Sequence, residues 1–131
     1  MWYTGVMMRS LVPLLALLSL AACSSMQATG GVFIPAGGSA NMQLVGSPQF
    51  SLASDAAAPL PLIFRPGTLL TGPSAMPPLN DSLAPGVTRW WSFADPMTII
   101  INNPTAAPAT ISYNIRGADV SILTSPYPST N

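Results

Sequence analysis

The stretch IIINNPTAAPATISYNIRG, from Ile99 to Gly117, decides the fold class of this chain. Apolar and polar residues alternate on both sides of its centre, and a period of two is typical of β-strands with one buried face. The alternating apolar positions are Met97, Ile99 and Ile101 before the centre and Ile111, Tyr113 and Ile115 after it. The centre, NNPTAAPA (102–109), contains Asn and Pro, which favour turns. We therefore expect a β-hairpin with one buried and one solvent-exposed face.

Further strand candidates lie on both sides of this hairpin, separated by Gly and Pro. They are Val32–Ile34, Asn41–Val45, Gln49–Leu52, Leu60–Arg65 as an edge strand, and Asp119–Thr124. No apolar period of 3.6 residues is present after the N-terminal leader, so we expect an all-β domain. The Ile99–Gly117 stretch resembles hairpins of immunoglobulin-like periplasmic and surface domains. That resemblance implies a small immunoglobulin-like β-sandwich with Pro-rich extended loops.

The segment from Ala53 to Gly86 is rich in Pro and Ala, which excludes a regular helix through it. Within it, Thr71–Pro85 indicates an extended loop or a polyproline-like arm. Such an arm is either a disordered spacer or a strap laid along a partner protein. The strap is favoured by apolar residues that a free linker does not require: Leu69, Leu70, Met76, Leu79 and Leu83.

The N-terminus has the pattern of an export signal. Leu11–Leu20 is an apolar run behind Arg9, far shorter than the roughly 20 residues of a membrane-spanning helix. The run closes with Leu20-Ala21-Ala22-Cys23, which resembles the lipobox of bacterial lipoprotein signal peptides. The resemblance implies cleavage between Ala22 and Cys23, with diacylglycerol on the Cys23 sulfur and an N-acyl chain on its amino group. The alternative is an ordinary secretory signal that leaves Cys23 as a free thiol.

The lipobox also predicts the domain boundaries and the location of the protein. We expect a signal peptide at 1–22 that includes the cleaved signal helix, an acylated cysteine with a flexible tether at 23–31, and one β domain at 32–131, with the Pro-rich arm at about 53–86. Ser24 follows Cys23 where an Asp would, in the lipoprotein family, favour retention in the inner membrane. The resemblance thus implies a lipid anchor in the outer membrane of a Gram-negative cell, facing the periplasm.

Charged groups are scarce, which excludes several functions. The chain has no His, and after the leader its ionisable residues are three Arg and four Asp. Without His, Lys or clustered carboxylates we expect no catalytic triad, no metal site and no cofactor other than the lipid, and therefore no enzyme. Too few basic residues are present for nucleic acid. Asp81 and Asp119 are expected as turn formers. The scarcity reflects either genomic composition or a surface that lies against lipid or protein.

The most distinctive cluster is Arg89-Trp90-Trp91-Ser92-Phe93. In a strand, Trp90 and Trp91 point to opposite faces, so one can pack in the core while the other is exposed. An exposed Trp beside Arg89 is typical of a protein interface, and an exposed indole also suits stacking on a sugar ring. The simplest interpretation is that both indoles and Phe93 fill a small core. The sequence does not decide which Trp is buried.

These observations predict a non-catalytic lipoprotein that is a structural subunit of an envelope assembly of the secretion, conjugation or pilus type. The chain is similar to small lipoprotein subunits of such machines in its lipobox, its size and its proline content. Larger members of that group carry an α/β domain, and no helix is expected here. One alternative is an envelope module that binds a glycan or a protein through an exposed Trp. A further alternative is the outer spanin of a phage lysis cassette.

Overall fold

The computed structural model describes residues 27–68, 72–73 and 77–129, and within these ranges it contains strands and turns with no helix. The all-β prediction is confirmed. The strands are β1 (Gln27–Ile34), β2 (Ser39–Ser54), β3 (Leu60–Thr68), β4 (Gly72–Pro73), β5 (Leu79–Leu83), β6 (Arg89–Ser92), β7 (Met97–Asn102) and β8 (Ala109–Ser125). The predicted signal peptide, its cleavage site at Ala22 and the acylated Cys23 lie outside the described residues.

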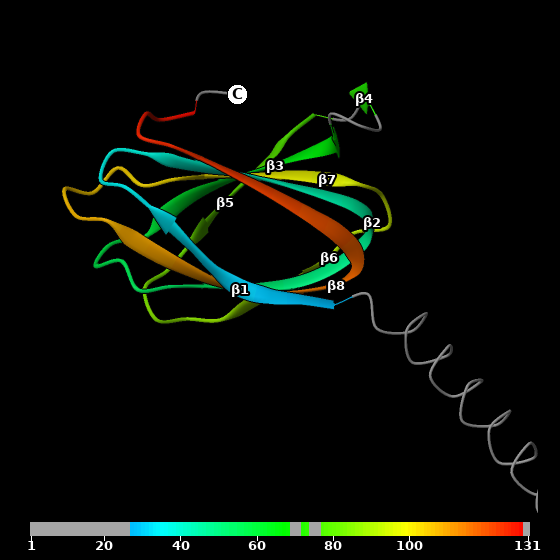
Figure 1. Cartoon of the computed structure of the whole chain (residues 1–131), viewed down its shortest axis with the longest axis horizontal. Coiled ribbons are helices and arrows are strands. Elements are labelled where there is room, and N and C mark those ends of the chain that lie inside the picture. Colours follow the sequence, from blue (N-terminus) through cyan, green and yellow to red (C-terminus); the bar gives the residue numbers. More distant parts are fainter. Residues whose placement is uncertain (1–26, 69–71, 74–76, 130–131) are drawn as a thin grey trace, which may run out of the picture.

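One antiparallel sheet folds over itself into two layers, so the predicted β-sandwich is observed (Figure 1). β2 and β8 pair along most of their length and run through both layers. The first layer contains β1, residues 109–116 of β8, residues 49–54 of β2, and β6. The second layer contains residues 118–125 of β8, residues 39–46 of β2, β7, β3 and β5. The two layers are therefore joined by a shared pair of strands.

Glycines let β2 and β8 turn from one layer into the other. The β2–β8 register shifts between Gly46 and Gln49, and Gly46 and Gly117 have φ values of 141° and 73°. A Cβ atom at Gly46 would collide with the carbonyl oxygen of Gly117. Asn41–Val45 and Gln49–Leu52, expected as two strands, are thus parts of the single strand β2. Likewise, the expected final strand is the second half of β8, because these glycines bend each strand without ending it.

The predicted hairpin is wrong. β7 lies in the second layer, where it pairs with β2 and β3, whereas residues 109–116 of β8 lie in the first layer, where they pair with β1 and β2, so the two arms of the predicted hairpin do not pair with each other. β7 is also buried on both faces, since Thr98 and Ile100 are 7% and 1% exposed. The sequence period was consistent with a strand, but it could not tell a turn within a layer from a crossing between layers. The connection at 103–108 is such a crossing.

Asn103 holds that crossing in place. Its side-chain nitrogen donates to the carbonyl oxygens of Ile34 (3.2 Å), Pro35 (3.2 Å) and Ala107 (2.9 Å). Its side-chain oxygen accepts from the backbone nitrogen and the hydroxyl of Thr105 at 3.1 and 2.6 Å. Asn103 is only 1% exposed, and leaving such a group unpaired would cost about 1–3 kcal/mol. The crossing is therefore specified by one buried amide.

The core lies between the layers. Its largest fully buried side chains are Phe50, Phe64, Ile34, Met42, Leu44, Leu52, Leu60, Leu62, Leu83, Ile99 and Ile101. Each burial contributes roughly 1.5–3 kcal/mol relative to an exposed side chain. The inward-facing residues of β2 serve both layers, with Met42 and Leu44 in the second and Phe50 and Leu52 in the first. β2 thus carries the centre of the core.

Three further predictions change. β3 is an internal strand because β7 covers one side of it and β5 the other, whereas Leu60–Arg65 was expected at an edge. β3 and β5 together place much of the expected Pro-rich arm inside the sheet, and residues 69–71 and 74–76 of that arm lie outside the described residues. β1 begins at Gln27, so the last part of the expected tether is a paired strand.

Substitution of Gly46 should test the bend directly. We expect Gly46→Ala to lower the free energy of unfolding by about 2 kcal/mol or more, because the new methyl group meets backbone atoms of β8 at a positive φ. Gly31→Ala is the matched control, since a Cβ there makes only ordinary contacts. Urea unfolding followed by tryptophan fluorescence measures both. Equal stabilities for the two variants would contradict this account of the bend.

Candidate functional site

The Arg89–Phe93 cluster lies at an open edge of the sandwich. β6 is the last strand of the first layer on this side, and it pairs with β2 through Gln49–Leu52. β5 forms the corresponding edge of the second layer through its pairing with β3. Alternation along β6 places Trp91 on the inner face, opposite Phe50, and Trp90 on the outer face, opposite Ser51. Trp90 is 52% exposed, so the structure resolves which tryptophan is free.

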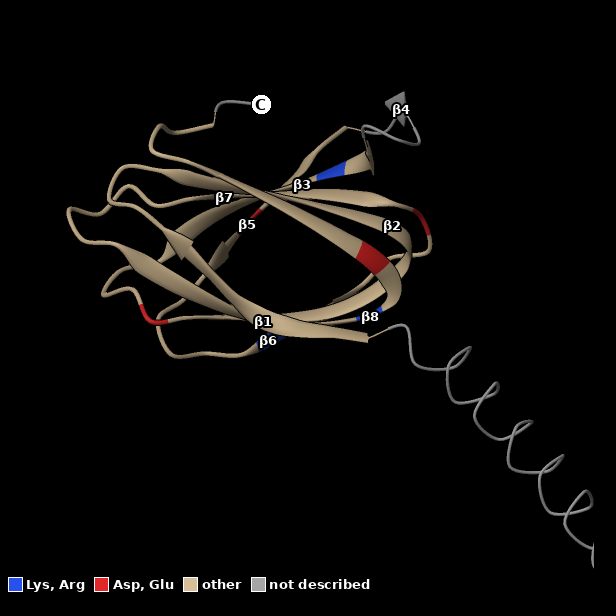
Figure 2. Cartoon of the chain, viewed as in Figure 1, with Lys and Arg blue, Asp and Glu red and all other residues tan. Residues whose placement is uncertain are grey.

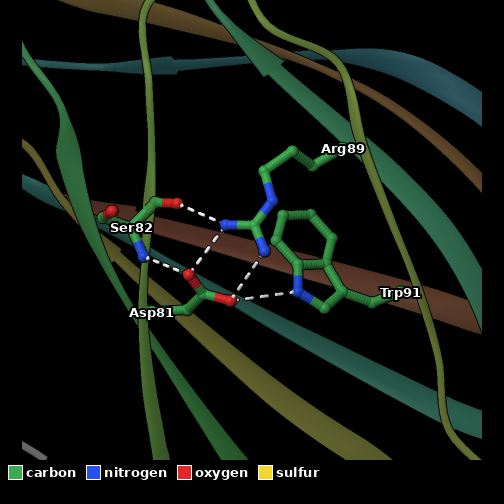
Figure 3. Close-up of polar contacts among 4 residues, drawn as sticks. All are labelled: Asp81, Ser82, Arg89 and Trp91. Carbon is green, nitrogen blue, oxygen red and sulfur yellow. Dashed lines mark hydrogen bonds and ion pairs between the residues drawn. The ribbon is translucent and has the colours of Figure 1, made fainter.

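Three side chains connect the two edges, and we call Asp81, Arg89 and Trp91 the clasp (Figure 3). The Arg89 guanidinium donates to both carboxylate oxygens of Asp81, at 2.7 and 3.1 Å, and the Trp91 indole nitrogen donates to the same carboxylate at 3.3 Å. Arg89 also donates to the Ser82 carbonyl oxygen at 2.9 Å. The guanidinium carbon lies 4.8 Å from the centre of the Trp91 ring, a cation–π distance. A bidentate ion pair with these supports fixes β6 against β5.

The clasp lowers the pKa of the Asp81 carboxyl group. The hydrogen bonds from Arg89 are the largest cause, and the backbone N–H of Ser82, which donates to the carboxylate at 2.7 Å, is the next. The same pairing raises the pKa of Arg89. Asp81 was expected as a turn former, and that expectation is wrong because it lies in β5. Asp119, also expected in a turn, lies in β8 opposite Val45.

The inner side of the site is an aromatic cluster. Trp91 stacks on Phe50 with ring centres 5.5 Å apart and meets Phe64 edge-on at 5.3 Å. Phe93 lies 5.9 Å from Phe50 and 5.5 Å from Phe64. Of the predicted interface residues, Trp91 and Phe93 are therefore partly buried against the core, whereas Trp90 is the most exposed aromatic side chain of the cluster. The packing of Trp91 on the inner face of β6 therefore holds in place the strand that carries Trp90 on its outer face.

Further apolar side chains are exposed near the clasp. Leu79 precedes Asp81 in β5 and is 54% exposed, and Val87 precedes Arg89 and is 47% exposed. We call Leu79, Val87 and Trp90, with the half-exposed ion pair between β5 and β6, the docking edge. Single exposed hydrophobic residues are common on proteins, but several of them at one edge are a feature of binding sites.

Trp90 also borders a row of uncharged polar residues. The strand register aligns Trp90 with Ser51 of β2, Asn114 of β8 and Thr29 of β1 across the outer face of the first layer. Gln27 donates to the Asn114 side chain at 3.3 Å. We call this row the polar face. No sequence pattern indicates this face, because its members come from four separate strands and become neighbours only through the fold.

Other classes of site have little support in the described part of the chain. It contains no group of three or more His, Cys, Asp or Glu residues that could hold a metal ion. Among the same residues, no helix is long and apolar enough to cross a membrane. The carboxylate of Asp55 accepts a hydrogen bond from the backbone nitrogen of Thr110 at 2.7 Å, which ties the end of β2 to β8. The Asp55 carboxylate thus has a structural role in joining two strands.

Comparison with known proteins yields no family. No family model and no curated protein matches the chain. Among solved structures, it is similar to a de novo designed double-stranded beta-helix, with 16% identity over 68% of this chain and 96% of the other, and a TM-score of 0.43. It is also similar to a family two carbohydrate esterase from Cellvibrio japonicus, with 7% identity, 79% and 33% coverage, and a TM-score of 0.41. The chain thus spans about a third of the esterase, and neither likeness supports an argument about function.

Acid should release the clasp. The folded-state pKa of Asp81 lies below the unfolded value of about 3.9, so the unfolded chain binds this proton first. The clasp therefore stabilises the fold above about pH 4, and that contribution is lost as the pH falls through the folded pKa. We expect Asp81→Asn to lower Tm by no more than a few degrees at neutral pH, because the pair is partly exposed.

The difference in Tm between the wild type and Asp81→Asn should shrink towards zero as the pH falls to about 2. Asp95→Asn, which removes an exposed carboxylate outside the clasp, controls for the change in net charge. Thermal unfolding followed by circular dichroism gives all three curves. A difference that grows on acidification would contradict the direction of the pKa shift.

Proposed function

We propose that this protein is a non-catalytic lipoprotein that serves as a structural subunit of a bacterial envelope assembly of the secretion, conjugation or pilus type. Diacylglycerol and an N-acyl chain on Cys23 would hold it in the outer membrane, facing the periplasm. Two or more acyl chains are needed for stable anchoring, and this modification supplies them. The proposal rests on the lipobox pattern for its location and on the docking edge for its activity.

The length of chain before β1 supports a membrane-proximal role. Only Ser24, Ser25 and Met26 separate Cys23 from Gln27, so the chain between anchor and domain reaches about 14 Å at most. A domain on so short a connection stays beside the headgroups and meets partners at the membrane surface. Such a short connection favours a subunit that assembles with proteins at the membrane surface over a module that binds ligands far from the membrane.

Trp90 is the observation that carries the docking proposal. Its indole is half exposed, yet its strand is fixed by β2 on one side and by the clasp on the other. A pre-organised aromatic side chain loses little conformational entropy on binding, and tryptophan is enriched among residues that dominate interface energies. Leu79 and Val87 would extend the contact, and Arg89 supplies a polar rim.

The distribution of charge supports the same function. Figure 2 shows that charged residues are few and scattered over the described strands and loops. The ion pair between Arg89 and Asp81 removes two more charges from those that remain free. Interface cores are depleted of charged residues, and an uncharged surface lowers the desolvation cost of association. Non-specific attraction to nucleic acid is correspondingly weak.

The polar face favours a second candidate, an envelope module that binds a neutral glycan. Sugar rings stack on exposed indoles, and their hydroxyl groups pair with amide and hydroxyl side chains. Asn114 and Thr29 stand in register with Trp90 and offer such groups, whereas Ser51 between them is buried. The docking edge and the polar face share Trp90, so their ligands would compete.

Removal of the cysteine tests the anchor. We expect Cys23→Ser to appear in the soluble periplasmic fraction, whereas the wild type sediments with the outer membrane, because the variant cannot receive a thioether-linked lipid. Ser24→Ala is the matched control and should sediment like the wild type. Fractionation with immunoblotting measures both. Sedimentation of Cys23→Ser with the membrane would contradict a lipid anchor.

Site-specific photocrosslinking in the native host tests the docking edge. A photoreactive residue at position 90 should give a discrete adduct with an envelope protein, identified by mass spectrometry, and Trp90→Ala should reduce co-purification of that protein at least tenfold. Position 123 is the control, because Leu123 is 70% exposed but lies in the second layer, away from the edge. Trp90→Ala should leave Tm unchanged, since Trp90 is outside the core.

Equal adducts at positions 90 and 123 would contradict the docking edge.

The glycan alternative predicts a different outcome for the same variant. No protein adduct forms at position 90, and tryptophan fluorescence of the wild type shifts on addition of cell-surface polysaccharide. Trp90→Ala abolishes the shift, whereas Phe33→Ala, which removes an exposed aromatic group from β1, retains it.

A further inference from the structure

β1 is an edge strand of unusual composition for its position. It pairs with β8 along its whole length, and none of the other described strands pairs with its outer side. An edge strand presents backbone donors and acceptors that can pair with another chain. Soluble proteins usually protect such edges with charged residues, prolines, bulges or short strands.

None of these protections is present in β1. Its eight residues, QATGGVFI, include no charge and no proline, and the register with β8 runs unbroken from Gln27↔Arg116 to Ile34↔Ala109. Other edge segments in the described part of the chain differ. β5 carries Asp81, β6 has four residues and carries Arg89, and residues 118–125 of β8 contain Asp119. Among these edge segments, β1 is therefore the one that lacks a protective charge.

We propose that β1 pairs antiparallel with β1 of a second copy of this chain, so that the first layers of two molecules form one continuous sheet. A two-fold axis normal to the sheet keeps the inner faces of both copies on the same side, so that residues of the same face stand opposite each other. The geometry places this axis at Gly31. The proposal does not depend on the lipid anchor or on the docking edge.

Side-chain sizes match across this register. With Gly31 on the axis, Phe33 stands opposite Thr29 of the second copy, Val32 opposite Gly30, and Ile34 opposite Ala28, so each large apolar residue faces a small one. Phe33 is 61% exposed on the outer face, and pairing would cover part of its ring. Because β1 carries no charge, the two copies bring no like charges together.

The dimer would leave the docking edges free. In the first layer the strands follow the order β1, β8, β2 and β6, so β6 lies at the end farthest from β1. Two paired molecules would therefore present Trp90 at both outer ends of one long layer. A symmetric dimer of this kind doubles the number of contacts to a repeating partner.

A disulfide trap tests the register in the full chain. We place Gly31→Cys in a Cys23→Ser background, so that the introduced thiol stands alone. A Cβ at Gly31 makes ordinary contacts, the nearest at 3.5 Å to Thr110, whereas one at Gly30 would lie 2.7 Å from the Tyr113 hydroxyl. Directly opposite residues of antiparallel strands have Cα atoms about 4.5–5.5 Å apart, which a disulfide can bridge.

Mild oxidation should convert most of the Gly31→Cys protein into a disulfide-linked dimer. Ser112→Cys in the same background is the control, because Ser112 is exposed and stands next to Gly31, one strand further from the proposed axis. It should remain a monomer on a non-reducing gel. Equal crosslinking of the two variants, or none at Gly31→Cys, would overturn the proposed pairing.

Light scattering coupled to size exclusion gives a test without an introduced thiol. The Cys23→Ser chain should elute as a dimer, and the added substitution Phe33→Lys should halve its mass, because it places two like charges at the new interface. Leu123→Lys, at a site in the second layer that is more exposed than Phe33, should leave the dimer intact. Unchanged far-UV circular dichroism confirms that each variant is folded. A monomeric Cys23→Ser chain, or loss of the dimer only with Leu123→Lys, would contradict the proposal.

Discussion

The fold depends on one constraint, which is that β2 and β8 belong to both layers at once. Their paired path bends at Gly46 and Gly117, where side chains would collide with the neighbouring backbone. Because the same two strands supply inward residues on both sides of the bend, neither layer can bury its apolar face without the other. In described residues that contain no cysteine, two continuous, mutually paired strands thereby join the layers.

The bend also determines what is left exposed. Beyond the bend, the second half of β2 enters the first layer and pairs there with β6. The edge strands β5 and β6 consequently face each other across the open side of the sandwich. The clasp closes that side with the ion pair and the Trp91 indole, and it leaves Trp90 pointing outward from a fixed strand. The proposed docking function thus uses Trp90, whose position is determined by the packing of the adjacent Trp91 against the core.

The sequence predicted the strand content, because alternation along Met97–Ile101 and Ile111–Ile115 reflects local backbone geometry. It did not predict the partners of those strands. Asn103 resembles an ordinary turn residue until its amide is seen bonded to Ile34 and Pro35, which lie far away in sequence. The Arg89–Phe93 cluster is distinctive in the sequence, but its ion-pair partner Asp81 and the polar neighbours of Trp90 come from other strands. Such long-range contacts leave no periodic signal in the sequence.

The central claim is that both layers and the β6 strand form one cooperative body that presents Trp90 rigidly. Native-state hydrogen exchange measured by NMR tests it most directly. The account predicts that amides of β2 and β8 on both sides of the Gly46 bend exchange only through global unfolding, with the same free energy of opening, and that β6 amides bonded to β2 are protected with them. Different opening free energies for the two halves of β2, or β6 amides that exchange as fast as those of a loop, would contradict it.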